Sequence, residues 1–391
     1  MKKLLIIAFS LFVTSVFAQS MNPKQYALIS GELLRGKPIN YIPYVNEDNM
    51  VFSRNADYLF LVNVDQKEEG RLVVYSLKLK SEIKTFKIKK TGIDYFWGKI
   101  ICNPENSGQL AIVLNKGEVR VINNWQTAPE DVLLQKPGEH SVAVNAYVEM
   151  GQMAFSKDGK SLFFIENRTK ASIDKNEVVK SADLSTGKIT VKKLPDGKKP
   201  YIAYQIKTFI GVDEIIVFNE GTKTQNSSIE IFDLTANKFV RKFDCGTATG
   251  FNSSMASPRI VFFNYGGYEL NLQTGQKNET IKRIKKSLEG EDTSLDIHYA
   301  PGKGYVVGYL YYWEKRTETA TTITTRRKTK SGLFFFDENG NNVMGSFPAV
   351  NAKIPDAGVR NYQISPNGKY IIFNHDDKDD SKNERLVIAT L

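Results

Sequence analysis

The sequence predicts an all-β protein built from a repeated four-stranded unit. Short runs rich in Val, Ile, Phe and Tyr alternate with Gly, Asn, Asp and Pro along the chain, which is typical of strands joined by tight turns. A hairpin motif recurs several times, and a second turn motif recurs between its copies. We expect no amphipathic helix after residue 18, so the repeated strands should account for the whole fold.

The first 18 residues have the pattern of a secretory signal peptide. Lys2 and Lys3 precede an apolar run over residues 4–17, and Val16 and Ala18 are small residues before a cleavage point at Gln19. The alternative is a membrane anchor, but this run is shorter than the roughly 20 residues that span a bilayer. We therefore predict a signal peptide over 1–18, a single domain over 19–391, and export from a bacterial cell, either to the periplasm or as a secreted or cell-surface protein.

The first repeated motif is a hairpin. Residues 153–164 read MAFSKDGKSLFF and residues 362–373 read YQISPNGKYIIF, so that Ser156 aligns with Ser365 and Gly159 with Gly368. An earlier copy has Ala56 in place of the glycine. An apolar strand ends at the serine, Gly supplies the positive φ of the turn, and a second strand returns.

The second motif is a polar turn after a further strand. Its copies cover residues 182–188, 232–238 and 270–276, with a shorter form at 336–341. Because this turn joins two more strands, the two hairpins together make a four-stranded unit.

The spacing of the units predicts a seven-bladed β-propeller. The first strands start about 52 residues apart, and four strands in that length fit one propeller blade. Six or eight blades remain compatible with the two weakest copies. The expected starts are Val51, Ile100, Met153, Tyr204, Met255, Ile297 and Tyr362.

The chain ends predict how the ring closes. The last unit has only three strands, the third over residues 385–390, while residues 26–34 form an unassigned strand-like run. The N-terminal segment should therefore complete the last blade, which removes exposed strand edges. An open two-domain β protein is the competing interpretation.

These motifs resemble those of TolB-type and WD-repeat-like propellers of bacterial exported proteins. The resemblance covers nearly the whole mature chain through the S-x-D/N-G-K hairpin and the D-L-x-T-G-K turn, but the Trp-Asp and Gly-His marks of the eukaryotic WD repeat are absent. It implies a protein-binding platform, although related propellers also bind sugars or hydrolyse small substrates.

Binding residues are expected on the face that carries long insertions. The insertions fall at residues 167–177, 220–228, 314–330 and 376–384, each between the second and third strands of a unit. The third holds Arg326, Arg327 and Lys328, which would bind acidic groups, and its threonines favour a projecting β-ribbon. The alternative for these insertions is a set of neutral solvated loops.

Aromatic contact is expected from Tyr95 and Trp97, in the connection that enters the second unit. Stacked aromatic rings could bind a sugar or a partner side chain. The alternative is that these two residues pack against the inner strand.

No catalytic residue is predicted. His140, His298 and His375 are isolated, and Cys102 and Cys245 should be unpaired buried thiols. The chain carries 53 Lys and Arg against 43 Asp and Glu, a net charge of +10, but a signal peptide makes nucleic acid an improbable partner. We expect no metal, no cofactor and no transmembrane anchor.

The sequence thus predicts a non-catalytic platform that binds a protein or cell-envelope component, with an acidic group as the recognised chemistry. The alternative is a propeller enzyme or carbohydrate-binding protein with a metal-dependent site at the channel mouth.

Overall fold

A computed structural model describes the strands and most tight turns of the chain. The described residues are 25–29, 50–63, 70–88, 99–114, 118–135, 140–141, 144–170, 174–192, 204–208, 213–219, 221, 225–248, 251–254, 257–263, 267–287, 294–300, 302–318, 323–347, 359–375 and 385–391. The predicted signal peptide and the Asp-rich insertion at 376–384 lie outside these residues.

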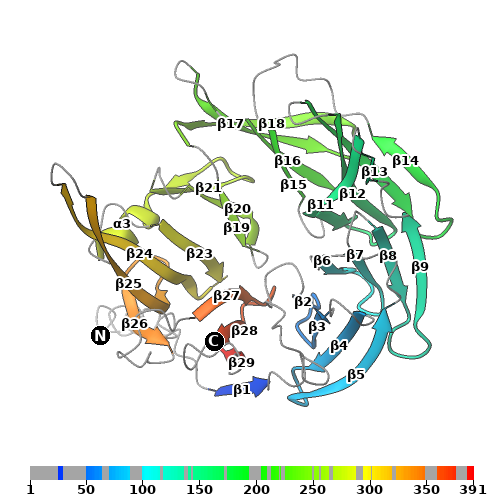
Figure 1. Ribbon diagram of the computed structural model, residues 1–391, viewed down its shortest axis with the longest axis horizontal. Helices are drawn as coiled ribbons and strands as arrows, with labels where there is room; N and C mark the ends of the chain where they lie inside the picture. The colour runs from blue at the N-terminus through cyan, green and yellow to red at the C-terminus, as the bar shows by residue number, and fades with distance from the viewer. Residues whose placement is uncertain are drawn as a thin grey trace, which may run out of the picture.

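Within the described residues the strands form seven mostly antiparallel sheets, which Figure 1 shows arranged radially around a common centre. The first two sheets have four strands each, in chain order. The first contains β2 (Met50–Phe52), β3 (Tyr58–Asn63), β4 (Gly70–Ser76) and β5 (Ser81–Ile88). The second contains β6 (Lys99–Cys102), β7 (Leu110–Leu114), β8 (Glu118–Asn123) and β9 (Glu130–Gln135).

The next two sheets follow the same order, with one addition. The third contains β10 (His140–Ser141), β11 (Val144–Phe155), β12 (Ser161–Lys170), β13 (Asp174–Asp183) and β14 (Ile189–Lys192). The fourth contains β15 (Tyr204–Thr208), β16 (Glu214–Asn219), β17 (Ser227–Asp233) and β18 (Lys238–Gly246). The two-residue β10 is an extra strand beside the predicted first strand of the third sheet.

The fifth and sixth sheets differ most in strand length. The fifth contains β19 (Asn252–Ser254), β20 (Ser257–Phe263), β21 (Tyr268–Asn271) and β22 (Lys277–Asn278). The sixth contains β23 (Ser294–Ala300), β24 (Gly304–Glu318), β25 (Ile323–Phe336) and β26 (Asn342–Phe347). Figure 1 shows β24 and β25 running together beyond β23 and β26 as a two-stranded ribbon.

The seventh sheet joins the two ends of the chain. It contains β27 (Val359–Ile364), β28 (Tyr370–His375), β29 (Arg385–Thr390) and β1 (Gln25–Ile29), in that spatial order. Strand β1 pairs antiparallel with β29, from Gln25 opposite Thr390 to Ile29 opposite Leu386. The predicted pairing of the N-terminal run with the last unit is thus present over residues 25–29.

Three sequence predictions need correction. The first strand of the fifth sheet is β19, so the prediction that this strand starts at Met255 was wrong. Ser254 of β19 pairs with Ser257 of β20, so the connection between these two strands is much shorter than in other units. The insertion at 167–177 is largely paired backbone, since β12 and β13 continue to Lys170 opposite Asp174.

The third correction is the helix α3 (Thr280–Ser287), which occupies a stretch expected to contain no helix. Ile281 and Ile284 are buried three residues apart, on one side of the helix, among lysines. That i, i+3 spacing is helical, but eight residues are too few for it to stand out in the sequence.

The core lies between neighbouring sheets. Phe60 of β3 packs with Ile112 of β7, and Phe155 of β11 packs with Val113, which joins the first three sheets. Ile372 of β28 packs with Met50 and Leu61 of the first sheet, so the last sheet contacts the first. Burial of each such large side chain contributes about 1.5–3 kcal/mol, so the sheet-to-sheet contacts hold the scaffold together.

No helix within the described residues is both long enough and apolar enough to cross a membrane.

Candidate functional site

In four of the sheets, the turn between the first and second strands is closed by its own polar side chains. In the third sheet, the Ser156 hydroxyl donates to Asp158 Oδ1 at 2.6 Å and accepts the Ser161 amide at 2.9 Å. Gly159 has φ +68°, a conformation in which glycine is unstrained. Ser156 is buried, and both of these hydrogen bonds lie within the turn. The S-x-D/N-G-K motif therefore stabilises the hairpin in this sheet.

The same arrangement recurs in the first and seventh sheets. Ser365 donates to Asn367 Oδ1 at 2.8 Å and accepts the Tyr370 amide at 2.9 Å, and Ser53 accepts the Tyr58 amide at 3.0 Å. In the first sheet Ala56 takes the positive-φ position at 57°. A non-glycine residue is strained there, and the turn is held in place by its serine.

In the third to sixth sheets, the turn between the third and fourth strands is capped by an acid or amide at its first position. Asp183 accepts the amides of Ser185 and Thr186 at 2.9 and 3.0 Å. The Ser185 hydroxyl and these two amides lower the pKa of Asp183 from 3.8 to about 2. Asn271 accepts two turn amides in the same way in the fifth sheet.

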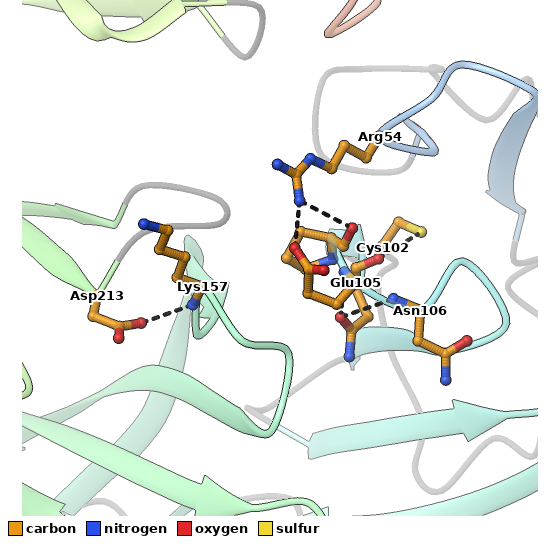
Figure 2. Close-up of polar contacts among 8 residues, drawn as sticks. Arg54, Cys102, Glu105, Asn106, Lys157 and Asp213 are labelled. Carbon is orange, nitrogen blue, oxygen red and sulfur yellow. Dashed lines mark hydrogen bonds and ion pairs between the residues drawn. The ribbon is translucent and has the colours of Figure 1, made fainter.

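First turns of neighbouring sheets are linked to one another, as Figure 2 shows for Arg54 and Glu105 and for Lys157 and Asp213. Arg54 forms an ion pair with Glu105 of the next sheet, and Asp213 accepts the Lys157 amide at 2.8 Å. The Arg54 and Glu105 side chains are 65% and 51% exposed, so their ion pair contributes little to stability.

Further links continue this row of turns in both directions. Asn103 donates to the Gly159 carbonyl at 2.8 Å, and Asn367 donates to the Asn55 carbonyl at 3.1 Å. The first turns of sheets seven, one, two, three and four are therefore joined side by side. The polar groups that form these links hold neighbouring sheets together.

The predicted basic residues lie on β25. Backbone pairing places Arg327 opposite Trp313 and Lys328 opposite Tyr312, while Arg326 lies opposite Lys315. The predicted β-ribbon is confirmed by this ladder, which continues to Glu318 opposite Ile323. Tyr95 and Trp97 lie outside the described residues, so their predicted role stays a prediction.

Helix α3 places the basic cluster of residues 282–286 beside the base of the ribbon, a position that the sequence did not indicate. Ile281 and Ile284 pack with Tyr305 of β24 and with Phe334 and Phe336 of β25. Lys282, Arg283 and Lys286, on the opposite side of the helix, are exposed. The helical spacing of the two isoleucines was the signal that could have placed these cations on one surface.

Behind α3, a buried carboxylate joins the fifth and sixth sheets. Glu269 accepts hydrogen bonds from Tyr305 and Asn278, both at 2.9 Å, and is 4% exposed. Burial, followed by the neighbouring Glu269 charge, raises the pKa of Tyr305 far above its ordinary value. The tyrosine therefore stays protonated and fixes the position of the seam between the two sheets.

The described histidine side chain is a core residue. His298 is 5% exposed, and its ring centroid lies 4.5 Å from that of Tyr362 in the next sheet. Among the described residues no three His, Cys, Asp or Glu side chains are grouped as metal ligands. His140 and His375 lie on strands β10 and β28.

Both cysteines are free and buried, as predicted. Burial raises the pKa of the Cys102 thiol to about 12 and that of Cys245 to about 11. Thiols with such values are protonated at neutral pH and therefore poor nucleophiles.

Comparison with protein families and with curated proteins found no match in sequence. Solved structures do match. An oligogalacturonate lyase in complex with manganese has a TM-score of 0.53 at 12% identity, covering 95% of this chain and 98% of that chain. The β-propeller domain of Cps50 (Swd1) from Myceliophteria thermophila has a TM-score of 0.48 at 11% identity, covering 90% and 99%.

TolB from Acinetobacter baumannii also matches, with a TM-score of 0.37 at 12% identity, covering 85% of this chain and 80% of that chain. Structures of a WD-repeat-type and of a TolB propeller are thus among the matches, in line with the resemblance that the turn motifs predicted, and the likeness of fold above a TM-score of 0.5 is that to the oligogalacturonate lyase. Identities of this size show the fold alone, so the function has to be argued from the residues of this chain.

Proposed function

We propose that residues 19–391 form one closed seven-bladed β-propeller, exported after removal of residues 1–18. The seven sheets, the packing of the last sheet against the first and the pairing of β1 with β29 support this architecture. Gln363 of β27 also donates to the Met50 carbonyl of β2 at 3.3 Å, which links the two innermost strands across the junction.

The propeller acts as a non-catalytic platform that binds an acidic protein or envelope component through the ribbon. The observation that carries this proposal is the long β24–β25 pair, which brings Arg326, Arg327 and Lys328 beyond the other strands of its sheet. Binding residues concentrate on excursions from a rigid scaffold, and Tyr95 and Trp97 would add aromatic contact on the same side.

The test is affinity capture from cross-linked cell envelopes with the tagged mature protein. A variant with Arg326, Arg327, Lys328 and Lys330 changed to Ser should lose the captured partner. A control variant changes Lys78, Lys157, Lys160 and Lys188 to Ser, which removes equal charge from exposed turn residues. Loss of the partner in both variants, or in neither, would contradict a binding site on the ribbon.

A propeller enzyme or carbohydrate-binding protein is the second candidate. It is favoured by the likeness to an oligogalacturonate lyase in complex with manganese. Elemental analysis of the purified protein and calorimetry with oligogalacturonate, with and without Mn²⁺, discriminate the two. Stoichiometric metal or saturable sugar binding would favour this second function over the platform.

A further inference from the structure

The distal part of β25 has a strand on one side only within the described residues. Strand β26 pairs with β25 between Leu333 and Phe336, and β23 pairs with β24 no further than Tyr311. Beyond these points, in the part of the chain that the structure describes, β24 and β25 pair with each other alone, as far as Glu318 and Ile323. The backbone amides and carbonyls along the other edge of β25 are therefore a template for one more strand.

The register divides the ribbon cations between its two faces. Successive residues of a strand alternate between faces, and directly opposed residues share a face. Arg326, Lys328 and Lys330 therefore share one face of the ribbon with Lys315, which is opposite Arg326. Arg327 and Arg316 belong to the other face, together with Trp313 and Glu318.

The cationic face has a regular spacing and no acidic residue at its paired positions. Arg326, Lys328 and Lys330 follow one another at every second residue, about 6.8 Å apart along an antiparallel strand. Glu314 falls at the irregularity between Trp313 and Lys315, outside the paired positions. A ligand that matches this face carries negative charges at the same interval.

We propose that an extended acidic segment of a partner protein adds to the edge of β25 as a further strand, with its acidic residues at alternate positions opposite Arg326, Lys328 and Lys330. This inference rests on the proposed function and names the chemistry and binding mode of the partner. Main-chain hydrogen bonds to the edge supply affinity, and the alternate charge pairs fix register and face.

A protein segment fits this edge better than a polysaccharide or a lipid surface. An added strand has backbone amides and carbonyls at the spacing of the β25 edge, whereas a sugar chain or a headgroup layer does not. The row of cations disfavours pairing with a second copy of the same ribbon, because like charges would face each other. Specificity for an acidic strand follows from that repulsion.

The base of the ribbon is held in the core, so the edge is presented by a fixed support. Phe335 and Phe336 are fully buried, and α3 packs against the start of β24 and the end of β25. The exposed Lys282, Arg283 and Lys286 of α3 add to the positive potential there. Such a potential speeds the encounter with an acidic segment.

The experiment measures binding of synthetic peptides to the mature protein by fluorescence anisotropy. The test peptide alternates glutamate with threonine and valine, and a second peptide of equal composition has its glutamates in one block. A third is the alternating peptide with N-methyl groups on every second amide. We expect the alternating peptide to bind about tenfold more tightly than either of the others, because each of those lacks the charge register or the ladder hydrogen bonds.

Two charge-matched variants locate the face. Arg326→Ser should weaken binding of the alternating peptide about fivefold, whereas Arg316→Ser, on the other face of the ribbon, should change it less than about twofold. Equal loss in both variants, or equal binding of the alternating and N-methylated peptides, would overturn strand addition in favour of non-directional attraction. So would polygalacturonate binding that depends on the ribbon.

The platform function and the strand addition can be refuted independently of each other. A ribbon-dependent partner recovered from envelopes, combined with indifference to N-methylation, would retain the platform and remove strand addition. Peptide binding with the expected register, combined with no ribbon-dependent partner in envelopes, would retain strand addition and remove the envelope role.

Discussion

The first turns of the sheets and the β24–β25 ribbon are both rich in polar residues, but they use them differently. In the turns, Ser156 and Ser365 each bond to backbone and side-chain groups within five residues, and Lys157 and Asn367 are linked to the next sheet. In the ribbon, cations recur at alternate positions on strands that extend past their neighbours. The repeated polar motif maintains the scaffold, and the irregular excursion is the place to look for binding.

Deletion of strand β1, which belongs to the scaffold, should have the largest effect on stability. Deleting residues 25–29 should lower the free energy of unfolding by roughly 3–5 kcal/mol, if each lost ladder hydrogen bond contributes about 1 kcal/mol. Loss of β1 also exposes the edge of β29, so we expect self-association. Urea unfolding and light scattering measure both effects, and unchanged values would contradict the role of β1 in completing the seventh sheet.

A single buried serine should have the next largest effect. Ser365→Ala removes the acceptor of the Tyr370 amide and the donor to Asn367 at a fully buried site. We expect a loss of about 1–3 kcal/mol, the cost of leaving a buried polar group unpaired. The matched control is Ser185→Ala at an exposed turn, which should change stability by less than about 0.5 kcal/mol. Equal effects at the two sites would contradict a structural role for the motif.

The acidic turn caps should give a smaller, pH-dependent effect. The folded-state pKa of Asp183 is lowered to about 2, so its stabilising contribution is present above its ordinary value of 3.8 and is lost as the pH falls towards 2. Asp183→Asn should remove this part of the acid sensitivity, since Asn271 caps the equivalent turn without a charge. Unfolding midpoints measured between these pH values, with and without the substitution, provide the comparison.

Shortening the ribbon should have the smallest effect on stability. Replacing residues 315–326 with an Asn-Gly turn removes strand that, among the described residues, pairs only within the ribbon, so we expect a change below about 0.5 kcal/mol. The same variant should lose the partner and the acidic peptide. A large fall in the unfolding midpoint would show instead that the ribbon is part of the scaffold.

Much of the local structure could be predicted because its causes are local. The turn serines, their Asp or Asn partners and the positive-φ glycines are a few residues apart, so each copy is visible in a short window of sequence. The copy with Ala56 at the glycine position was still recognised by its serine, whereas in the fifth sheet the short connection after β19 displaced a predicted strand.

The candidate site was predictable in part. The charge and threonine content of residues 314–330 indicated a basic ribbon, and the strand pairing agrees. Which cations share a face depends on the register across the irregularity at Glu314, and the cations of α3 reach the base of the ribbon through packing between two sheets. Neither relation is present in a short stretch of sequence.

The sequence by itself determined the strands, the tight turns and the basic character of the ribbon, because hydrogen bonds within a hairpin depend on adjacent residues. The tertiary structure decided which strands from distant parts of the chain meet, such as β1 with β29 and Gln363 with Met50. It also decided which ribbon residues share a face. These outcomes depend on packing between sheets and on register, and both are set by contacts among residues far apart in the chain.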